Sequence, residues 1–208
     1  RMHPHIRSEV DRRRASVLPR PPPLASTVHA AKAASKEGSK ARTLPYRELC
    51  IGMHVRRGDS CSLGSRFCPP NRTAAYFGAA AALRDRYLIN KLVVATDDAE
   101  AAALCMAGAY GFDCRTRVMD RERFNARTSI ERRVAHHASG GLSGSAVALD
   151  TLADVEMLSD CEAHVLVLRS AVSRLALGLS VARKGRFAPL VSLQWPWGGL
   201  PGPSPLPS

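Results

Sequence analysis

Short apolar runs that alternate with longer helical segments are the feature that most constrains the fold of this chain. Three of these runs, residues 49–55, 92–96 and 163–168, carry almost no charge and end in polar or charged residues. Runs of this length and composition are typical of strands that are buried on both faces of a parallel sheet. Two shorter candidates for strands, residues 112–116 and 189–193, follow the same scheme.

The segments between these runs are predicted to be helices, because they are longer and combine alanine or leucine with polar residues. The expected helices cover residues 73–87, 99–109, 145–158 and 170–182. Asp98 and Glu100 suit the N-terminus of the second of these helices, and Ser170 is placed to cap the last. Strands that alternate with helices predict an α/β fold, a Rossmann-like doubly wound parallel sheet with helices on both faces.

Residues 117–144 interrupt this alternation with a long polar stretch that contains several glycines, and we expect it to be irregular. His136 and His137 are candidate metal ligands, but adjacent side chains project in different directions, so solvated or hydrogen-bonded roles are favoured. A GxGxxG motif does not follow the first strand, and no Walker A lysine motif is present. The sequence therefore argues against a dinucleotide-binding fingerprint and against a P-loop NTPase.

The net charge of +12 suggests an anionic partner, but the charge is unevenly distributed. Residues 1–47 carry 11 Lys/Arg against 3 Asp/Glu, whereas residues 48–208 carry 19 against 15. We predict a mobile basic linker rich in proline and alanine (1–47), a folded domain (48–195) and a Pro/Gly-rich tail (196–208). The linker is either a solvated spacer, which is favoured, or a polybasic arm for a membrane surface or nucleic acid. No nucleic acid is expected for the folded domain.

The six cysteines do not form a CxxC pair, which argues against a zinc ribbon. Cys50, at the start of a strand, is expected to be a buried small hydrophobic residue. Cys61 and Cys68 flank one loop and would suit a disulfide in a secretory lumen. Asn71 opens a glycosylation sequon, a motif that also arises by chance. No run approaches the roughly 20 apolar residues of a membrane span, and no signal peptide is visible.

The first strand ends in Arg56, Arg57, Gly58 and Asp59, and this junction is the candidate functional site. In an open α/β sheet, ligands bind beyond the carboxyl ends of the strands. Two guanidinium groups at that edge can clamp a diphosphate or a carboxylate, and a glycine after them lets the backbone turn closely around a ligand. Composition alone leaves open the alternative, a strand end with solvated charges.

The same edge of the sheet is expected to carry Asp97 and Asp98 after the second strand and Ser170 before the last helix. Together with the arginines, these groups would suit a nucleoside diphosphate. The segments HVRRGD (54–59), ATDD (95–98), LD (149–150) and SAVSRLA (170–176) occur in this order. In order and spacing they resemble the donor domain of α-1,6-fucosyltransferases, and the HxRR feature is shared with protein O-fucosyltransferases and bacterial nodulation fucosyltransferases. The resemblance covers about residues 49–195.

The resemblance implies the C-terminal, donor-binding half of a GT-B-like glycosyltransferase, which transfers fucose from GDP-fucose with inversion and without a metal or other cofactor. It gives Arg56 and Arg57 the pyrophosphate role and, with Asp59, makes them the catalytic residues. His54 and Asp59 would order the loop. The residues implied to contact or frame the nucleotide are His54, Arg56, Arg57, Tyr76, Asp97, Asp98, Asp150 and Ser170. The resemblance also implies a glycan or glycoprotein acceptor and a Golgi or secretory lumen.

The sequence departs from the α-1,6 pattern after the first motif. Where those enzymes have a lysine and then a glutamate, this chain has Ser60 and Gly64. The chain opens with Arg1, and we expect a fragment that lacks the acceptor-binding half and binds donor without transferring fucose. The alternatives are a non-catalytic nucleotide-sugar-binding relative or fragment and, from the net charge, a basic nucleic-acid-binding protein.

Overall fold

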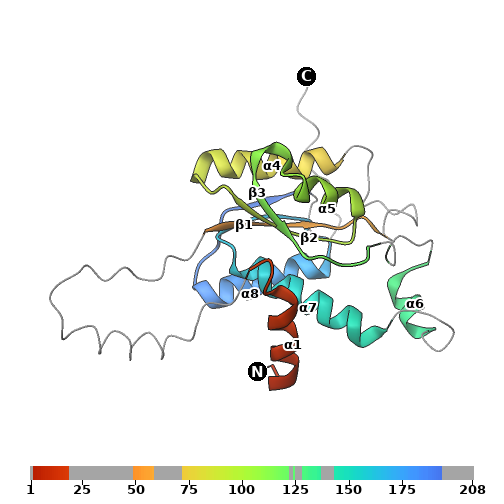
Figure 1. The fold of residues 1–208 in the computed structure, drawn as a ribbon. Coiled ribbons are helices and arrows are strands. Elements are labelled where there is room, and N and C mark those ends of the chain that lie inside the picture. The colour runs from red at the N-terminus through yellow and green to blue at the C-terminus, as the bar shows by residue number, and fades with distance from the viewer. Residues whose placement is uncertain are drawn as a thin grey trace, which may run out of the picture.

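The computed structural model describes residues 2–18, 49–58, 72–121, 124, 128–136 and 143–193, and Figure 1 shows the elements that they form. Several predictions lie outside the described residues: Asp59 of the motif, Ser60 and Gly64, Cys61 and Cys68, the sequon at Asn71, His137, residues 19–47 of the linker and residues 196–208 of the tail. Among the helices of the described ranges, none is long and apolar enough to cross a membrane.

Within the described residues, five parallel strands form one sheet in the order β3-β2-β1-β4-β5. The strands are β1 (Cys50–Val55), β2 (Lys91–Thr96), β3 (Asp113–Thr116), β4 (Ala163–Leu166) and β5 (Leu190–Ser192). Val55 of β1 lies opposite Thr96 of β2, and Ile51 lies opposite Ala163 of β4. Each predicted strand is present, and the order is that of a Rossmann-like sheet. The predicted α/β fold with a parallel sheet is confirmed.

Helices cover both faces of the sheet (Figure 1). One face carries α4 (Arg72–Tyr87) and α5 (Ala99–Met106), and the other carries α7 (Gly144–Asp160) and α8 (Ala171–Lys184), with α1 (Pro4–Arg14) packed on α7. Two short elements, η1 (Ala109–Gly111) and α6 (Ile130–Ala135), lie between β2 and α7 in the chain. The predicted helices are all present, and their ends fall within a few residues of the expected limits.

The apolar core lies on both faces of the sheet, because successive strand residues point to opposite sides. Along β2, Leu92 and Val94 belong to one cluster with Phe77 of α4, whereas Val93 packs with Met157 of α7. All six residues of β1 are buried. Burial on both faces explains why these strands appear in the sequence as continuous apolar runs.

A disulfide joins the start of β1 to the end of α7. Cys50 bonds to Cys161, and their Cα atoms lie 4.7 Å apart. Cys50 is buried, but the prediction that it serves only as a small hydrophobic residue is wrong, because α7 ends beside the first residue of β1. Gly52 permits this approach, since a Cβ atom there would lie 3.2 Å from Cβ of Cys161. A second disulfide, Cys105–Cys114, links α5 to β3.

The linker prediction is wrong for residues 4–14, which form helix α1. Val10 and Arg14 are completely buried, and Val17, just after the helix, joins the core cluster on the α7 face. Charged side chains dominate α1, so its sequence lacks the apolar stripe that identifies a docked helix. Arg13 and Arg14 are instead neutralised by carboxylates of α7. The folded domain therefore includes residues 2–18.

The prediction that residues 117–144 are irregular is wrong for residues 130–135, which form α6. Ser129 caps this helix by accepting a hydrogen bond from the backbone N–H of Arg132, and Glu131 lies in its first turn. Both features favour a helix start, because they stabilise the unpaired N–H groups of the first turn.

Candidate functional site

A pocket of about 270 Å³ lies at the carboxyl ends of β1 and β2, beside the first turn of α8. The chain adds β2 and β3 on one side of β1 and then β4 and β5 on the other side, so β1 is the point where the strand order reverses. Open α/β sheets bind ligands in the crevice at such a point. Of the predicted site residues that the structure describes, those that line the pocket are His54, Arg56, Asp97 and Asp150.

His54 is buried beside the pocket and ties the end of β1 to α8. Its Nδ1 atom lies 2.7 Å from the hydroxyl of Ser173. That hydroxyl also accepts a hydrogen bond from the N–H of Val167 at 3.2 Å, so it joins His54 to the end of β4 as well. Burial, together with the positive charge of Arg56, lowers the pKa of His54 to about 3. His54 therefore holds two elements together while it stays neutral.

His54 and His164 make the fold sensitive to mild acid. Burial lowers the pKa of His164, a residue of β4, to about 4. Below about pH 6.5 the unfolded chain binds protons on both histidines and the folded chain does not, so stability is complete above this pH and falls as the pH drops toward the folded pKa values. We expect the free energy of unfolding to fall by about 2–3 kcal/mol between pH 7 and pH 5.5.

Urea denaturation at several pH values measures this effect. The variant His164→Gln should reduce the pH dependence by about half, because His54 remains, whereas His136→Gln, a change at an exposed position, should leave it as it is in the wild type. Equal stability of the wild-type chain at pH 7 and pH 5.5 would show that the two buried histidines are not held neutral.

The side chains of the two arginines of the motif form ion pairs with different carboxylates. Arg56 pairs with Asp97, and the Oδ1 atom of Asp97 accepts the backbone N–H of Arg57 at 2.8 Å. The side chain of Arg57 donates to Glu100 at 2.9 Å and lies 3.7 Å from a carboxylate oxygen of Asp98. Among the described residues, Arg56 lines the pocket and Arg57 does not. The structure therefore places the first arginine of the pair at the pocket and the second against the start of α5.

Gly58 makes room for the carboxylate that holds both arginines. A Cβ atom on Gly58 would lie 2.5 Å from Oδ2 of Asp97 and 2.8 Å from its Cγ. Any side chain at this position would push Asp97 away from Arg56 and from the N–H of Arg57. The sequence predicted that this glycine lets the backbone turn closely around a ligand. In the structure the group that lies close to Gly58 is the carboxylate of Asp97.

Two carboxylates of α7 form an acidic wall of the pocket, which we define as Asp150 and Asp154. Arg117 bridges them, because its Nη1 donates to Oδ1 of Asp150 at 2.7 Å and its Nε donates to Oδ1 of Asp154 at 2.8 Å. Arg13 of α1 donates to the same Oδ1 atom of Asp150 at 2.6 Å. The acidic wall is thus neutralised from two elements that are distant in the sequence.

The two carboxylates of the acidic wall differ in their pKa values. Burial alone would raise the pKa of Asp150, but the hydrogen bonds and charges of Arg117 and Arg13 outweigh it, so the pKa is lowered. For Asp154 burial is the largest influence and the charge of Asp150 adds to it, so the pKa is raised in spite of Arg117. Such a pair offers one fixed anion and one group that can exchange a proton or pair with a polar edge of a ligand.

The other described residues of the site prediction lie outside the lining of the pocket. Tyr76 is buried in the core on the α4 face of the sheet. Asp98 caps α5, because its side chain accepts the N–H of Ala101 at 2.8 Å. Ser170 occupies the N-cap position of α8 as predicted, although its side chain makes no capping hydrogen bond. These three residues shape the elements around the pocket.

Sequence reasoning missed Asp154, Arg117 and Arg121. Asp154 had a usable signal, because it follows Asp150 by one helical turn and so lies on the same face of α7. Arg117 and Arg121 lie in the stretch that was predicted to be irregular, and no pattern there points to the pocket. Arg121 is buried and donates to the backbone oxygen of Thr96 at 3.2 Å, so it supports the end of β2.

Within the described ranges, no group of three or more histidine, cysteine or acidic side chains is placed to hold a metal ion. No family model and no curated protein matches the chain.

Proposed function

We propose that this chain is the donor-binding half of a GT-B-like fucosyltransferase and that it binds GDP-fucose in the pocket at the end of β1. The observation that carries the proposal is the convergence of the segments on which the resemblance rests. His54 and Arg56, Asp97 and Asp150 come from three separate segments, yet they line one pocket beside the first turn of α8. His54, Arg56 and Asp97 would meet at this edge in any such parallel sheet, but Asp150 lies on α7, and the resemblance alone assigns it to the site.

The pyrophosphate would lie between Arg56 and the N-terminus of α8. Val172, in the first turn of α8, lines the same pocket as Arg56, so the guanidinium group and the N–H groups of that turn approach one region. A guanidinium group has five N–H donors, so Arg56 can contact Asp97 and a phosphate oxygen together. These positively polarised groups would neutralise the charge on the departing GDP, the task that a metal ion performs in other transferases.

In the proposed reaction a hydroxyl oxygen of a glycan or glycoprotein acceptor attacks the anomeric carbon of fucose. A carbon–oxygen bond forms while the bond from that carbon to the β-phosphate oxygen breaks, and the electron pair of the broken bond leaves with GDP. The hydroxyl proton passes to a base. Attack from the side opposite GDP inverts the anomeric centre. The acceptor would be held largely by the other half of the enzyme, so we expect residues 1–208 alone to bind donor without transfer.

Two disulfides support a Golgi or secretory lumen as the location. Cys50–Cys161 and Cys105–Cys114 both lie within the described part of the chain. Disulfides form and persist in oxidising compartments and are rare in the cytosol.

A non-catalytic nucleotide-sugar-binding relative is the second candidate, because Ser60 and Gly64 stand where α-1,6-fucosyltransferases have a lysine and a glutamate. Assays with labelled GDP-fucose and a panel of glycan and peptide acceptors separate the two candidates when the other half of the enzyme is supplied. The nucleic-acid alternative has less support, since Arg13 and Arg14 of the basic segment contact carboxylates on α7.

The variant Arg56→Lys tests the proposed diphosphate site. Lysine keeps the positive charge but loses the planar fork that pairs with two oxygens, so GDP binding should weaken by about 1.5–3 kcal/mol. Isothermal titration of the chain with GDP measures this loss. The same titration in the presence of a chelator should give an unchanged affinity for the wild-type chain.

The matched control is Arg186→Lys, a change of the same kind at a side chain that is 60% exposed and pairs with Glu162. It should leave GDP affinity unchanged. If Arg56→Lys binds GDP as tightly as the wild type, Arg56 does not hold the diphosphate. If the wild-type chain does not bind GDP at all, the proposed function itself is wrong.

A further inference from the structure

Helix α1 supplies a side chain to the acidic wall of the pocket. Arg13 is 27% exposed, and its Nη1 atom lies 2.6 Å from Oδ1 of Asp150. Arg117 donates to the same oxygen at 2.7 Å. Asp150 is 5% exposed and lines the pocket, so the N-terminal helix reaches the site through one buried carboxylate.

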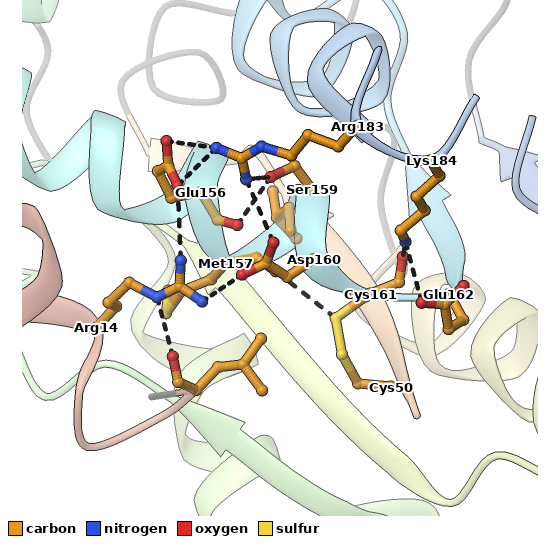
Figure 2. Close-up of polar contacts among 12 residues, drawn as sticks. Arg14, Cys50, Glu156, Met157, Ser159, Asp160, Cys161, Glu162, Arg183 and Lys184 are labelled. Carbon is orange, nitrogen blue, oxygen red and sulfur yellow. Dashed lines mark hydrogen bonds and ion pairs between the residues drawn. A yellow bond between two sulfur atoms is a disulfide. The ribbon is translucent and has the colours of Figure 1, made fainter. Parts of the chain in front are cut away.

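The arginines next to Arg13 pair with other carboxylates, although Glu9 is shared, because it also accepts a hydrogen bond of 2.9 Å from Nε of Arg13. Arg12 pairs with Glu9 on its own helix and is 72% exposed. Arg14 is fully buried and pairs with Asp160 at the end of α7 (Figure 2). Successive residues of a helix point about 100° apart, which is why three adjacent arginines meet three different environments. Of the three, Arg13 faces the pocket wall.

Other contacts hold α1 in place. Val10 and Val17 are buried, and Arg7 lies 3.5 Å from Glu156 of α7. Figure 2 shows Arg14 inserted between Glu156 and Asp160, toward the C-terminal end of α7 and beyond Asp150. Loss of the Arg13 side chain therefore leaves the anchors of α1 intact, and its effect on the pocket can be measured with the helix still docked.

We propose that Arg13 is a positioning residue that neutralises and orients Asp150 in the pocket wall, so that α1 completes the donor site. The identity of the ligand rests on the proposed function. Without Arg13, the acidic wall would lose one of the positive charges that neutralise it, and Asp150 and Asp154 would depend on Arg117. The wall would then present one more negative charge to a diphosphate held by Arg56. The negative charges of the wall and of the diphosphate repel each other, and the low effective dielectric constant of a pocket strengthens this repulsion. Binding of a diphosphate should therefore weaken by about tenfold.

The test compares three variants of the full chain: Arg13→Gln, Arg13→Lys and the matched control Arg12→Gln. Arg13→Gln should bind GDP about tenfold more weakly in isothermal titration. Arg13→Lys should stay within about threefold of the wild type, because it keeps the charge. Arg12→Gln should bind as the wild type does. Carbon-13 NMR of the aspartate carboxyl groups provides a second readout, in which Arg13→Gln raises the pKa of Asp150 and Arg12→Gln leaves it unchanged.

These readouts separate the inference from the proposed function. If the wild type binds GDP and Arg13→Gln binds it equally well, Arg13 does not act on the pocket and the inference is overturned, while the proposed function stands. If the wild type does not bind GDP, the proposed function fails and the NMR titration decides the inference: a shifted pKa of Asp150 supports it, and an unchanged pKa overturns it. A variant that only loses thermal stability, with both readouts unchanged, also overturns it.

Discussion

The variant Cys161→Ala is expected to lower the free energy of unfolding by about 4–5 kcal/mol. The Cys50–Cys161 disulfide joins residues that are 111 positions apart, so it removes a large amount of conformational freedom from the unfolded chain. Both cysteines are also buried in one cluster with Val93 and Met157, so the alanine variant loses packing in addition. The loss should appear in urea denaturation as a lower midpoint.

The second disulfide provides the comparison for this prediction. Cys105 and Cys114 are 9 positions apart, and the same chain-entropy argument gives about 2–3 kcal/mol for Cys114→Ala. The order of the two effects is the critical result. If Cys114→Ala costs as much as Cys161→Ala, loop closure is not the basis of the stabilisation.

The variant Glu156→Gln is expected to cost about 3–5 kcal/mol, the range for removal of one partner from a buried ion pair. Glu156 is 4% exposed, and both of its carboxylate oxygens accept hydrogen bonds of 2.8 Å from Arg183 of α8 (Figure 2). Arg14 of α1 lies 3.6 Å from the same carboxylate and is itself fully buried. Glutamine keeps the shape of the side chain but removes its charge, so that Arg14 and Arg183 have to share Asp160, the other carboxylate of α7 that pairs with both. One of the two carboxylates that join α1, α7 and α8 is then lost.

Chemical denaturation at pH 7 measures this loss, and Asp113→Asn is the matched control. Asp113 pairs with Arg115 on β3, where both side chains are about half exposed, so the control should cost between 0 and about 1 kcal/mol. Similar losses for the two variants would show that Glu156 contributes no more than a surface ion pair.

Both stability predictions concern the α1 and α7 side of the sheet, and this changes the description of the N-terminal segment. Residues 2–18 were predicted to be part of a linker because they are basic and contain few apolar residues. In the structure the opposite charges come from α7, more than 130 positions away in the sequence. A helix held largely by ion pairs should respond to ionic strength more strongly than the apolar core does.

The sequence by itself determined the architecture and the location of the candidate site. The five strands were found because a strand of a parallel sheet is buried on both faces, so its composition identifies it without knowledge of its neighbours. Strand–helix alternation then implies parallel strands, and parallel strands bring their carboxyl ends to one edge. For this reason Arg56 and Asp97 could be assigned to one site before their positions were known, whereas His54 and Asp150 were assigned to it by the resemblance. The identity of the ligand stays a prediction.

Tertiary structure alone decided which charged and sulfur-containing side chains meet. The sequence offers many arginines and carboxylates and six cysteines, and any of them is chemically able to pair with several others. Arg13 pairs with Asp150, and Cys50 with Cys161, because of the way α1, α7 and β1 pack. Such contacts join residues distant in the chain, and their partners are selected by the direction of a side chain on its helix or strand and by burial. The packing of one element against another is not encoded in the local pattern of residues, which is why the fold could be predicted and the pairing of its charged side chains could not.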